Sequence, residues 1–168
     1  DAVVEWQAAG LLACMESALD PATVGFEWFG YWRGRIDAAG ASLRCYAVPS
    51  LTGTPVFACE INDRGKDGRP YRAVQGRGCH PVPELALFKA VAEAIQGRAT
   101  YVAGARDDLF PDDYAPRRGE GMLVAFGLPP PPGMAGVDFA SVAPGCVDAT
   151  AEAEALACAG CGPVARVE

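Results

Sequence analysis

The chain has 168 residues, of which 51% are hydrophobic and 21% charged, and its formal net charge is −7. This length suits a single domain with a sufficient core, and the composition is that of a globular rather than a disordered chain. The acidic balance argues against a general binder of nucleic-acid backbones, although it does not exclude a nucleotide bound through a metal ion. No apolar run reaches the roughly 18 residues that a membrane span needs. We therefore expect no nucleic-acid partner and no membrane.

The first part of the chain predicts two helices with an aromatic segment between them. An apolar stripe at helical spacing predicts a helix from Val3 to Leu19, which Asp20-Pro21 ends. The aromatic segment FEWFGYW at 26–32 is expected in the core or in the wall of a groove. A short helix is predicted over residues 32–39, stopped at Gly40.

Three strands and a second long helix are predicted next. The strands are LRCYAVPS at 43–50, TPVFACEIND at 54–63 and YRAVQG at 71–76. Gly76-Arg77-Gly78 is expected to be a tight turn, and Pro83 suits the first turn of a helix that runs to about Ala99. Further on we expect an acidic loop at 103–114, a strand at 122–128, a stiff PPPPG linker at 129–133 and an alanine-rich helical tail at 148–159.

The seven cysteines lie mostly in apolar surroundings, such as LLACME and VFACEI. This pattern favours buried, reduced thiols in a cytoplasmic protein. Cys158 and Cys161 form one CxxC pair with no second pair and no nearby histidine, so a four-ligand zinc ribbon is not favoured. His80, the single histidine, stands beside two prolines and is expected in a turn or cap rather than in a catalytic mechanism.

The helix predicted from Pro83 carries the most informative polar residues. Glu93 and Gln96 are three residues apart and so present two side-chain oxygens from one face, which Lys89 shares. Oxygen ligands on a rigid helix suit a hard cation such as Mg²⁺, which usually completes its shell with water and phosphate. The opposite stripe is expected to be the buried side of the helix and consists of Leu85, Phe88, Ala92 and Ile95.

Residues from other elements can complete such a site. Glu16 can add a carboxylate from the first helix, and Arg98 and Arg106 can neutralise phosphate. A turn at Gly76 and Gly78 would let the backbone approach a ligand, and free N–H groups at a helix start attract anions. These residue types together predict a metal–phosphate site.

An ordinary surface helix is the competing interpretation. It would carry a Lys89–Glu93 ion pair and a solvated Arg98, and the RDD sequence at 106–108 would then be an ion pair that stabilises its loop. The chemistry of the residues leaves both interpretations open.

Several spaced elements, in the same order, resemble the YcaO family. That family has a strand with a PVF element, a small-residue turn with G-x-x-x-x-P, a helix reading AL-x-x-A-x-x-E-x-x-Q-x-R and an RDD loop. The match spans about Ile36 to Leu109, and GLLACMES at 10–17 looks more loosely like the family's GLLE-x-x-ER helix. The helix pattern falls on Ala86-Leu87, Ala90, Glu93, Gln96 and Arg98.

The resemblance implies an ATP-binding α+β fold with a mixed or antiparallel sheet flanked by helices. Residues 1–168 would be a single, partial domain, with 110–168 as its C-terminal part. Carried over, Glu93 and Glu16 would be Mg²⁺ ligands, and Gln96 and Arg98 would contact the nucleotide. Known members activate a peptide backbone amide by phosphorylation, which gives an azoline or, with a sulfide source, a thioamide. The implied partners are a substrate peptide or protein and an accessory protein that presents peptide or sulfur.

Two positions of the first helix depart from the family pattern. Ala13 stands where the family has the first Glu of E-x-x-E-R, and Ser17 stands where it has Arg. Loss of a metal ligand or a phosphate cation often costs orders of magnitude in rate. One hypothesis is therefore an ATP-dependent cyclodehydratase or thioamide-forming enzyme, of which this chain is a part that is inactive alone. The other is a degenerate relative that acts as a docking or scaffold protein in peptide modification.

Overall fold

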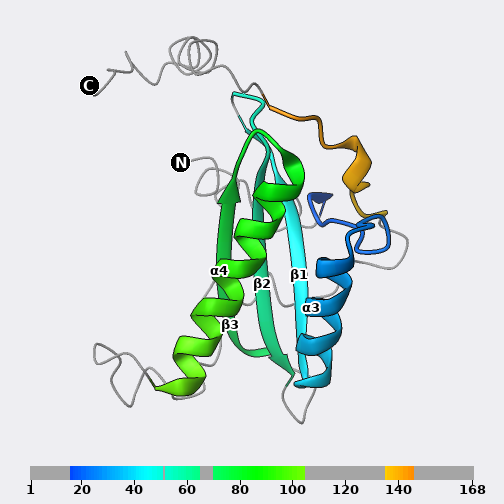
Figure 1. Ribbon diagram of the computed structural model, residues 1–168. Helices are drawn as coiled ribbons and strands as arrows, with labels where there is room; N and C mark the ends of the chain where they lie inside the picture. The colour runs from blue at the N-terminus through cyan, green and yellow to red at the C-terminus, as the bar shows by residue number, and fades with distance from the viewer. Residues whose placement is uncertain (1–15, 51, 65–69, 105–134, 146–168) are drawn as a thin grey trace, which may run out of the picture.

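The computed structural model describes residues 16–50, 52–64, 70–104 and 135–145. In these residues, three antiparallel strands in the order β1-β2-β3 form a sheet, and two helices cover one of its faces (Figure 1). The elements are α3 (Glu27–Ala38), β1 (Ala41–Val48), β2 (Val56–Arg64), β3 (Pro70–Cys79), α4 (Pro83–Ala103) and the short 3-10 helix η2 (Phe139–Ser141). The predicted α+β class, with an antiparallel sheet flanked by helices, is confirmed. The features predicted at 105–114, 122–128, 129–133 and 148–159, and the pair Cys158/Cys161, lie outside the described residues.

Helix α3 begins at Glu27, five residues before the predicted start, and so contains most of the aromatic segment. Phe29 is buried in the core, and Trp28 packs edge-to-face against Phe88 of α4 with ring centroids 5.2 Å apart. This packing outweighs the modest helix propensity of aromatic residues. The helix ends before Gly40, whose φ of 73° is the left-handed conformation that glycine adopts readily. The aromatic segment therefore supplies core contacts, as expected.

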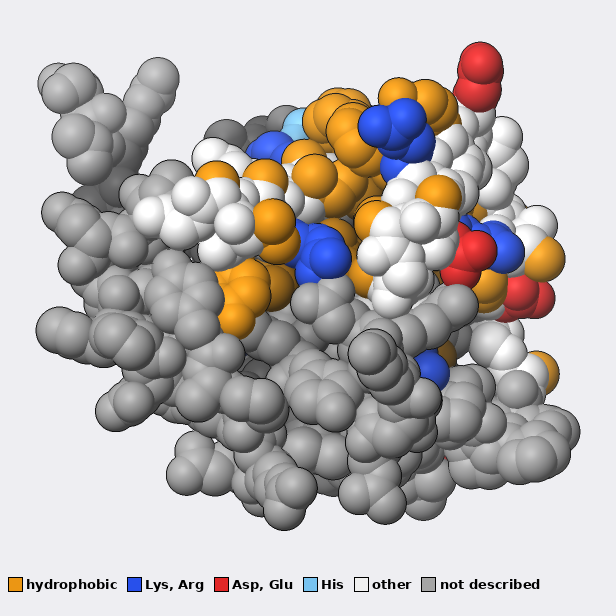
Figure 2. All heavy atoms as spheres, turned by 90° about the horizontal axis from the view of Figure 1, so that it is seen from below, with side chains coloured by type: hydrophobic (Ala, Val, Ile, Leu, Met, Phe, Trp, Pro, Cys, Tyr) orange, Lys and Arg blue, Asp and Glu red, His pale blue; other side chains and the backbone are white. Residues whose placement is uncertain are grey.

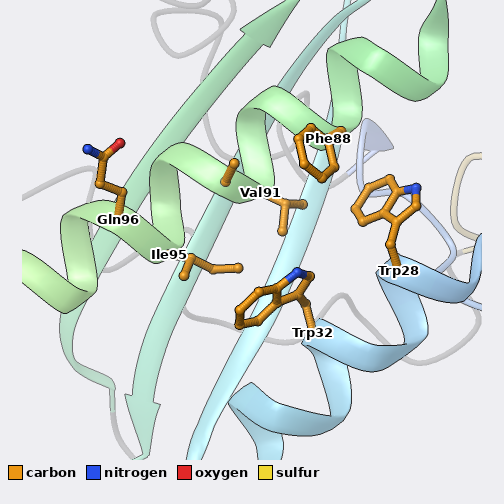
Figure 3. A pocket seen from close by; sticks show the side chains of 7 residues that line it. Trp28, Trp32, Phe88, Val91, Ile95 and Gln96 are labelled. Carbon is orange, nitrogen blue, oxygen red and sulfur yellow. The ribbon is translucent and has the colours of Figure 1, made fainter.

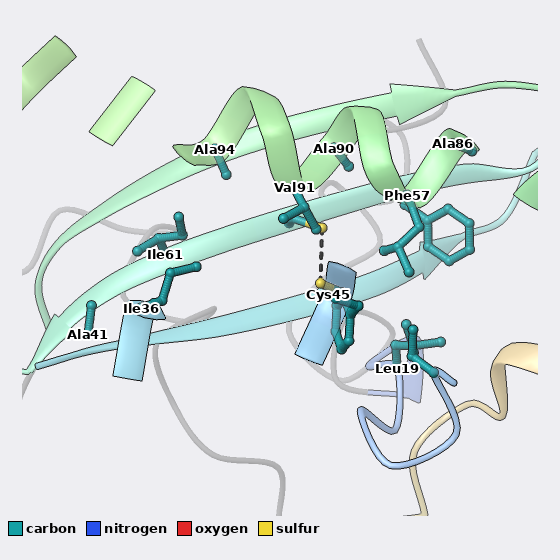
Figure 4. Packing of buried hydrophobic residues seen from close by; sticks show 14 residues of the cluster. Leu19, Ile36, Ala41, Cys45, Phe57, Ile61, Ala86, Ala90, Val91 and Ala94 are labelled. Carbon is teal, nitrogen blue, oxygen red and sulfur yellow. Dashed lines mark hydrogen bonds between the residues drawn. The ribbon is translucent and has the colours of Figure 1, made fainter. Parts of the chain in front are cut away.

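The core lies between the sheet and the two helices (Figure 4). Phe57 and Ile61 of β2 reach it from the sheet because alternate strand residues point to the same face. Cys45 and Cys59 are directly opposite in the β1–β2 register, and their Sγ atoms lie 3.0 Å apart. Both are buried and reduced, and burial raises the pKa of the Cys59 thiol, which makes it unreactive. The prediction of buried thiols is confirmed for this pair, whereas Cys79 is exposed.

Helix α4 buries a different face from the one predicted. The residues on its buried side are Ala86, Leu87, Ala90, Val91 and Ala94. Leu85 and Phe88, which were expected to be buried, are each 45% exposed. The prediction followed side-chain size, but the alanine-rich face packs on the sheet because small residues let the helix backbone approach the strands closely.

The glycines of β3 explain this close approach. Gly76 and Gly78 lie inside the strand Pro70–Cys79, so the predicted tight turn is wrong. A Cβ atom at Gly76 would overlap the carbonyl oxygen of Ala90, and one at Gly78 would overlap that of Ala86. The backbone of α4 thus occupies the space that we expected a ligand to fill, and the glycines are needed for helix–sheet packing.

Residues 3–15 of the first predicted helix lie outside the described residues, and its predicted last residues, up to Leu19, are not helical. Glu16 is still helical, but Ser17 to Leu19 run along the free edge of β1. The N–H of Leu19 donates to the carbonyl of Cys45, and the N–H of Ala47 donates to the carbonyl of Ser17, both at 2.8 Å. Backbone bonding to a strand edge outweighs the helical spacing of the apolar residues in this segment.

His80 lies in the turn between β3 and α4, as predicted. Its Nδ1 accepts a hydrogen bond from the N–H of Val82 at 3.0 Å, and its own N–H donates to the carbonyl of Pro55. Val82 is the residue before the first turn of α4 and has no side-chain cap. The imidazole therefore stabilises the start of this helix.

Gly76→Ala should lower the free energy of unfolding by about 2–3 kcal/mol, because the added methyl group forces α4 away from the sheet. Gly30→Ala is a matched control: nothing lies within 4 Å of a Cβ atom there, so it should stabilise α3 by about 0.5–1 kcal/mol. Urea unfolding of both variants measures the difference. Equal effects of the two substitutions would contradict the packing role of Gly76.

Candidate functional site

One exposed face of α4 runs beside β3 and carries Lys89, Glu93 and Gln96; we call it the β3-edge face. The Oε2 atom of Glu93 accepts a hydrogen bond from the backbone N–H of Arg77 at 3.2 Å. Lys89 Nζ donates to the carbonyl of Cys79 at 3.5 Å. Among the described contacts, both side chains bond to the strand backbone and not to each other. The ion pair of the surface-helix interpretation is therefore absent between these two described residues.

Gln96 lies one turn beyond Glu93 and is exposed. In the close-up its amide points away from Trp28 and Trp32, toward the side of α4 that faces β3 (Figure 3). The side-chain amide is therefore on the same face as the Glu93 carboxylate. The structure thus brings together two of the predicted site residues, each with an oxygen available to solvent.

Arg98 is not on this face. Five residues of α-helix rotate a side chain by about 140°, so Arg98 projects well away from Glu93. It is half-buried and has an interaction partner of its own. Gly76 and Gly78 are buried beneath α4, so neither offers its backbone to a nucleotide. The phosphate contact of Arg98 and the nucleotide role of both glycines stay predictions.

Glu16 lies at the opposite side of the sheet from Glu93. Its neighbour Ser17 bonds to the outer edge of β1, whereas Glu93 bonds to β3. Neighbouring strands are spaced by about 4.8 Å. The backbone of Ser17 and the backbone of Arg77 in β3 are therefore separated by roughly three strand spacings. Ser17, the neighbour of Glu16, and Glu93 therefore bond to opposite edges of the sheet, and the assignment of both glutamates as metal ligands stays a prediction. Among the described residues, no three His, Cys, Asp or Glu side chains cluster as a metal site would require.

The face of the sheet opposite the helices holds a polar group that the sequence did not predict. We call it the polar sheet face; it consists of Arg44, Tyr46, Glu60 and Asn62. Glu60 is only 1% exposed and Asn62 3%, yet within the described part of the chain neither side chain has a hydrogen-bond partner. The alternation of TPVFACEIND already places both on the face opposite Cys59 and Ile61, but alternation alone predicts exposed polar residues there. Burial of both is the unexpected finding.

Burial raises the pKa of Glu60 from 4.5 to about 7. Arg44 lies directly opposite Glu60 in the β1–β2 register. Asn62 and the Arg44 guanidinium favour the charged carboxylate, so they partly offset the rise in pKa that burial causes. Asn62 is near enough to act in this way, although the two side chains do not meet in good hydrogen-bond geometry. Burial also raises the pKa of Tyr46, and the charge of Glu60 raises it further. This face therefore holds a carboxyl group that titrates close to neutral pH.

The lower end of the described unit has no surface of a single charge. Lys and Arg side chains lie there among hydrophobic ones, with Asp and Glu side chains close by (Figure 2). Among the described helices, none has both the length and the apolar character to cross a bilayer.

Residues 1–157 match the family model described as YcaO cyclodehydratase, ATP- and Mg²⁺-binding. The chain belongs to the YcaO family. The resemblance seen in the PVF strand, the AL-x-x-A-x-x-E-x-x-Q-x-R helix and the RDD loop is thereby confirmed. Within the described part, that helix is α4.

A curated relative is the "Uncharacterized protein in tfuA 3'region" of Rhizobium leguminosarum bv. trifolii. It is 38% identical over 104 residues, which are 59% of this chain and 24% of the relative. The chain thus spans about a quarter of the length of that relative. The identity therefore concerns one part of a longer protein.

Two solved structures share the fold. One is described as "Heterocyclase in complex with substrate and Cofactor", with a TM-score of 0.65, and the other as "Structure of the heterocyclase TruD", with a TM-score of 0.51. Both are 17% identical to this chain, and each match covers 92% of this chain and 22% of the solved one. At this identity the likeness establishes the fold of this part.

Glu60→Gln should remove most of the pH dependence of stability between about pH 4.5 and 7. The folded-state pKa lies above the unfolded one, so the stabilisation is complete below about pH 4.5 and is lost as the pH rises through about 7. The variant should be more stable than the wild type at pH 8 by up to about 3 kcal/mol. Urea unfolding at pH 5 and pH 8 measures this. Glu27→Gln, an exposed change on α3, controls for net charge, and a Glu60→Gln variant with the wild-type pH slope would contradict the prediction.

Proposed function

We propose that the protein to which this chain belongs activates a backbone amide of a peptide with ATP and Mg²⁺. The observation that carries this proposal is the match of residues 1–157 to a family described as an ATP- and Mg²⁺-binding cyclodehydratase. The exposed Glu93 and Gln96 on the β3-edge face of α4 support it, because they occupy the polar positions of the family's helix pattern. Phosphoryl transfer depends mainly on positioning and charge neutralisation, which oxygen ligands on a rigid helix can provide.

The donor atoms on this face fit one side of a magnesium–phosphate site. One oxygen of Glu93 accepts the Arg77 N–H, which fixes the carboxylate and leaves its second oxygen for an ion. Gln96 can orient a water or a phosphate oxygen from one turn further along. When bound, Mg²⁺ and the nucleotide would supply charge neutralisation and the phosphoryl group. Glu16 and Arg98 are proposed only as contributors from outside this face.

The reaction that we propose is a net dehydration driven by ATP. A neighbouring Cys, Ser or Thr side chain of the peptide attacks the amide carbon, and the amide oxygen takes the γ-phosphoryl group. Departure of phosphate then leaves an azoline ring, ADP and phosphate. With a sulfide source as nucleophile the product is a thioamide. The residues of this chain hold the nucleotide in either case, so they do not choose between these products.

Glu93→Gln in the whole protein should lower peptide-dependent ATP turnover by about 100-fold or more, because the variant loses a metal-binding charge. Glutamine keeps an oxygen that can accept the Arg77 N–H, so folding should be retained. Phosphate release and thermal unfolding, measured side by side, separate the two effects. Glu27→Gln makes the same change on an exposed part of α3 and should leave turnover intact. Full turnover by Glu93→Gln would contradict the metal assignment.

A degenerate docking or scaffold protein in peptide modification is the second candidate. Ala13 and Ser17 favour it, since they replace an acidic and a basic position of the family pattern. The relative named for the tfuA 3' region is compatible with an accessory partner protein for either candidate.

The second candidate predicts that Ala13→Glu combined with Ser17→Arg raises the affinity for Mg-ATP from a low level by about ten-fold or more. Equilibrium binding of a fluorescent ATP analogue to the wild type and to the double variant measures this. Tight binding by the unmodified protein would exclude the scaffold and favour the enzyme.

A further inference from the structure

Helices α3 and α4 run side by side over the same face of the sheet, and a cavity of ≈ 200 Å³ lies between them (Figure 3). We call it the aromatic cavity. Its lining residues are Trp28, Trp32, Phe88, Val91, Ala92, Ile95 and Gln96. The rings of Trp28, Trp32 and Phe88 form its walls, and Val91 and Ile95 lie between the two helices (Figure 3). Apart from the indole N–H groups of the two tryptophans, Gln96 has the only polar side chain among these residues, and none of them is charged.

One wall of the aromatic cavity, Trp28, is held in place by several contacts. The indole Nε1 of Trp28 donates a hydrogen bond to Glu84 at 3.1 Å, and its ring packs edge-to-face against Phe29 as well as Phe88. A side chain fixed by both a hydrogen bond and ring contacts loses little freedom when a ligand binds. The wall of the cavity formed by Trp28 and Phe88 is therefore preorganised.

Apolar residues face outward around this cavity. Phe88 is 45% exposed and Trp32 36% exposed, although α4 already buries its alanine-rich side against the sheet. A helix that is apolar on two sides is normally covered on both. Three residues of the stripe that the sequence pattern assigned to the core, Phe88, Ala92 and Ile95, thus line this cavity instead.

Size decides what can occupy the cavity. A cavity of about 150 Å³ with apolar walls holds a benzene molecule, so ≈ 200 Å³ accommodates one aromatic side chain. Aromatic rings bury about 150–250 Å² each, so these partly exposed rings offer a few hundred Å² at most. A stable dimer needs about 800 Å² from each partner, which this patch does not supply. A second copy of the chain is therefore not the occupant that fits.

We propose that the aromatic cavity binds a peptide by taking up one uncharged aromatic side chain, with Gln96 at its rim. The absence of charged lining residues excludes recognition of a charged side chain by an ion pair. Edge and face contacts with three aromatic rings favour an aromatic over an aliphatic occupant. The inference goes beyond the proposed function, because it needs neither ATP nor Mg²⁺. The cavity lies on the α3 side of α4, and Gln96 stands at the boundary between it and the β3-edge face.

The test uses the whole protein labelled with 5-fluorotryptophan and followed by fluorine NMR. The signals of Trp28 and Trp32 are assigned from Trp28→Phe and Trp32→Phe variants. N-acetyl-phenylalanine amide is the probe, and N-acetyl-alanine amide is its matched control. Both assigned signals should shift saturably with the phenylalanine probe, which should bind roughly ten-fold or more tightly than the alanine compound.

Ala92→Leu fills the cavity from an exposed helix position. It should lower the affinity for the phenylalanine probe by about ten-fold or more. Ala103→Leu makes the same change at an exposed position in the last turn of α4, about two turns beyond the lining residues, and should leave binding unchanged. Unfolding curves check that both variants are folded. Unresponsive signals, equal binding of the two probes or full binding by Ala92→Leu would each overturn the proposal. Shifts on dilution without probe would assign the surface to self-association instead.

Discussion

The contact between α4 and β3, in which glycine faces alanine, is the constraint on which this unit depends. Gly76 and Gly78 have no room for a side chain, because the backbone of α4 passes directly above them. This close contact fixes how α4 is rotated about its own axis. Once Ala90 and Ala94 face the strand, Glu93 must lie at the edge of β3, and Phe88 must point toward α3. The β3-edge face and the aromatic cavity are both consequences of that rotation.

The sequence predicted the order and kind of the elements well, because alternation and helical spacing are local properties. It also identified the family, since the residues of the helix motif keep their spacing whatever the helix packs against. The faces of α4 were predicted wrongly. Large apolar residues normally mark the buried side, but the helix instead buries its alanines because β3 offers glycines. That choice depends on a strand several residues away and is not visible in the helix itself.

The candidate site was predictable only in part, because residue spacing shows which residues share a face but not what that face packs against. Glu93 and Gln96 share a face because they are three residues apart, which the sequence already determines. Arg98 points elsewhere because it is five residues beyond Glu93, and the motif alone did not take that rotation into account. Glu60 and Asn62 were missed because an alternating strand predicts which face a residue is on but not whether that face is covered.

The sheet and its helices thus separate three chemical environments: a buried carboxyl on the polar sheet face, an exposed carboxylate and amide beside β3, and an aromatic cavity between the helices. Under the two proposals, the second of these environments holds a nucleotide and the third holds a peptide side chain. Both lie on α4, on neighbouring sides that meet at Gln96. A single rigid helix would then relate the position of the peptide to that of the nucleotide, as amide activation requires.

The most direct test is a calorimetric titration of Mg-ATP into the whole protein, in the wild type and in Glu93→Gln. We expect saturable heat in the wild type and an affinity lower by about ten-fold or more in the variant, because the carboxylate contributes to holding the ion. Equal affinities in the two proteins would contradict the proposed nucleotide site, and would mean that the β3-edge face of α4 is not where the nucleotide binds.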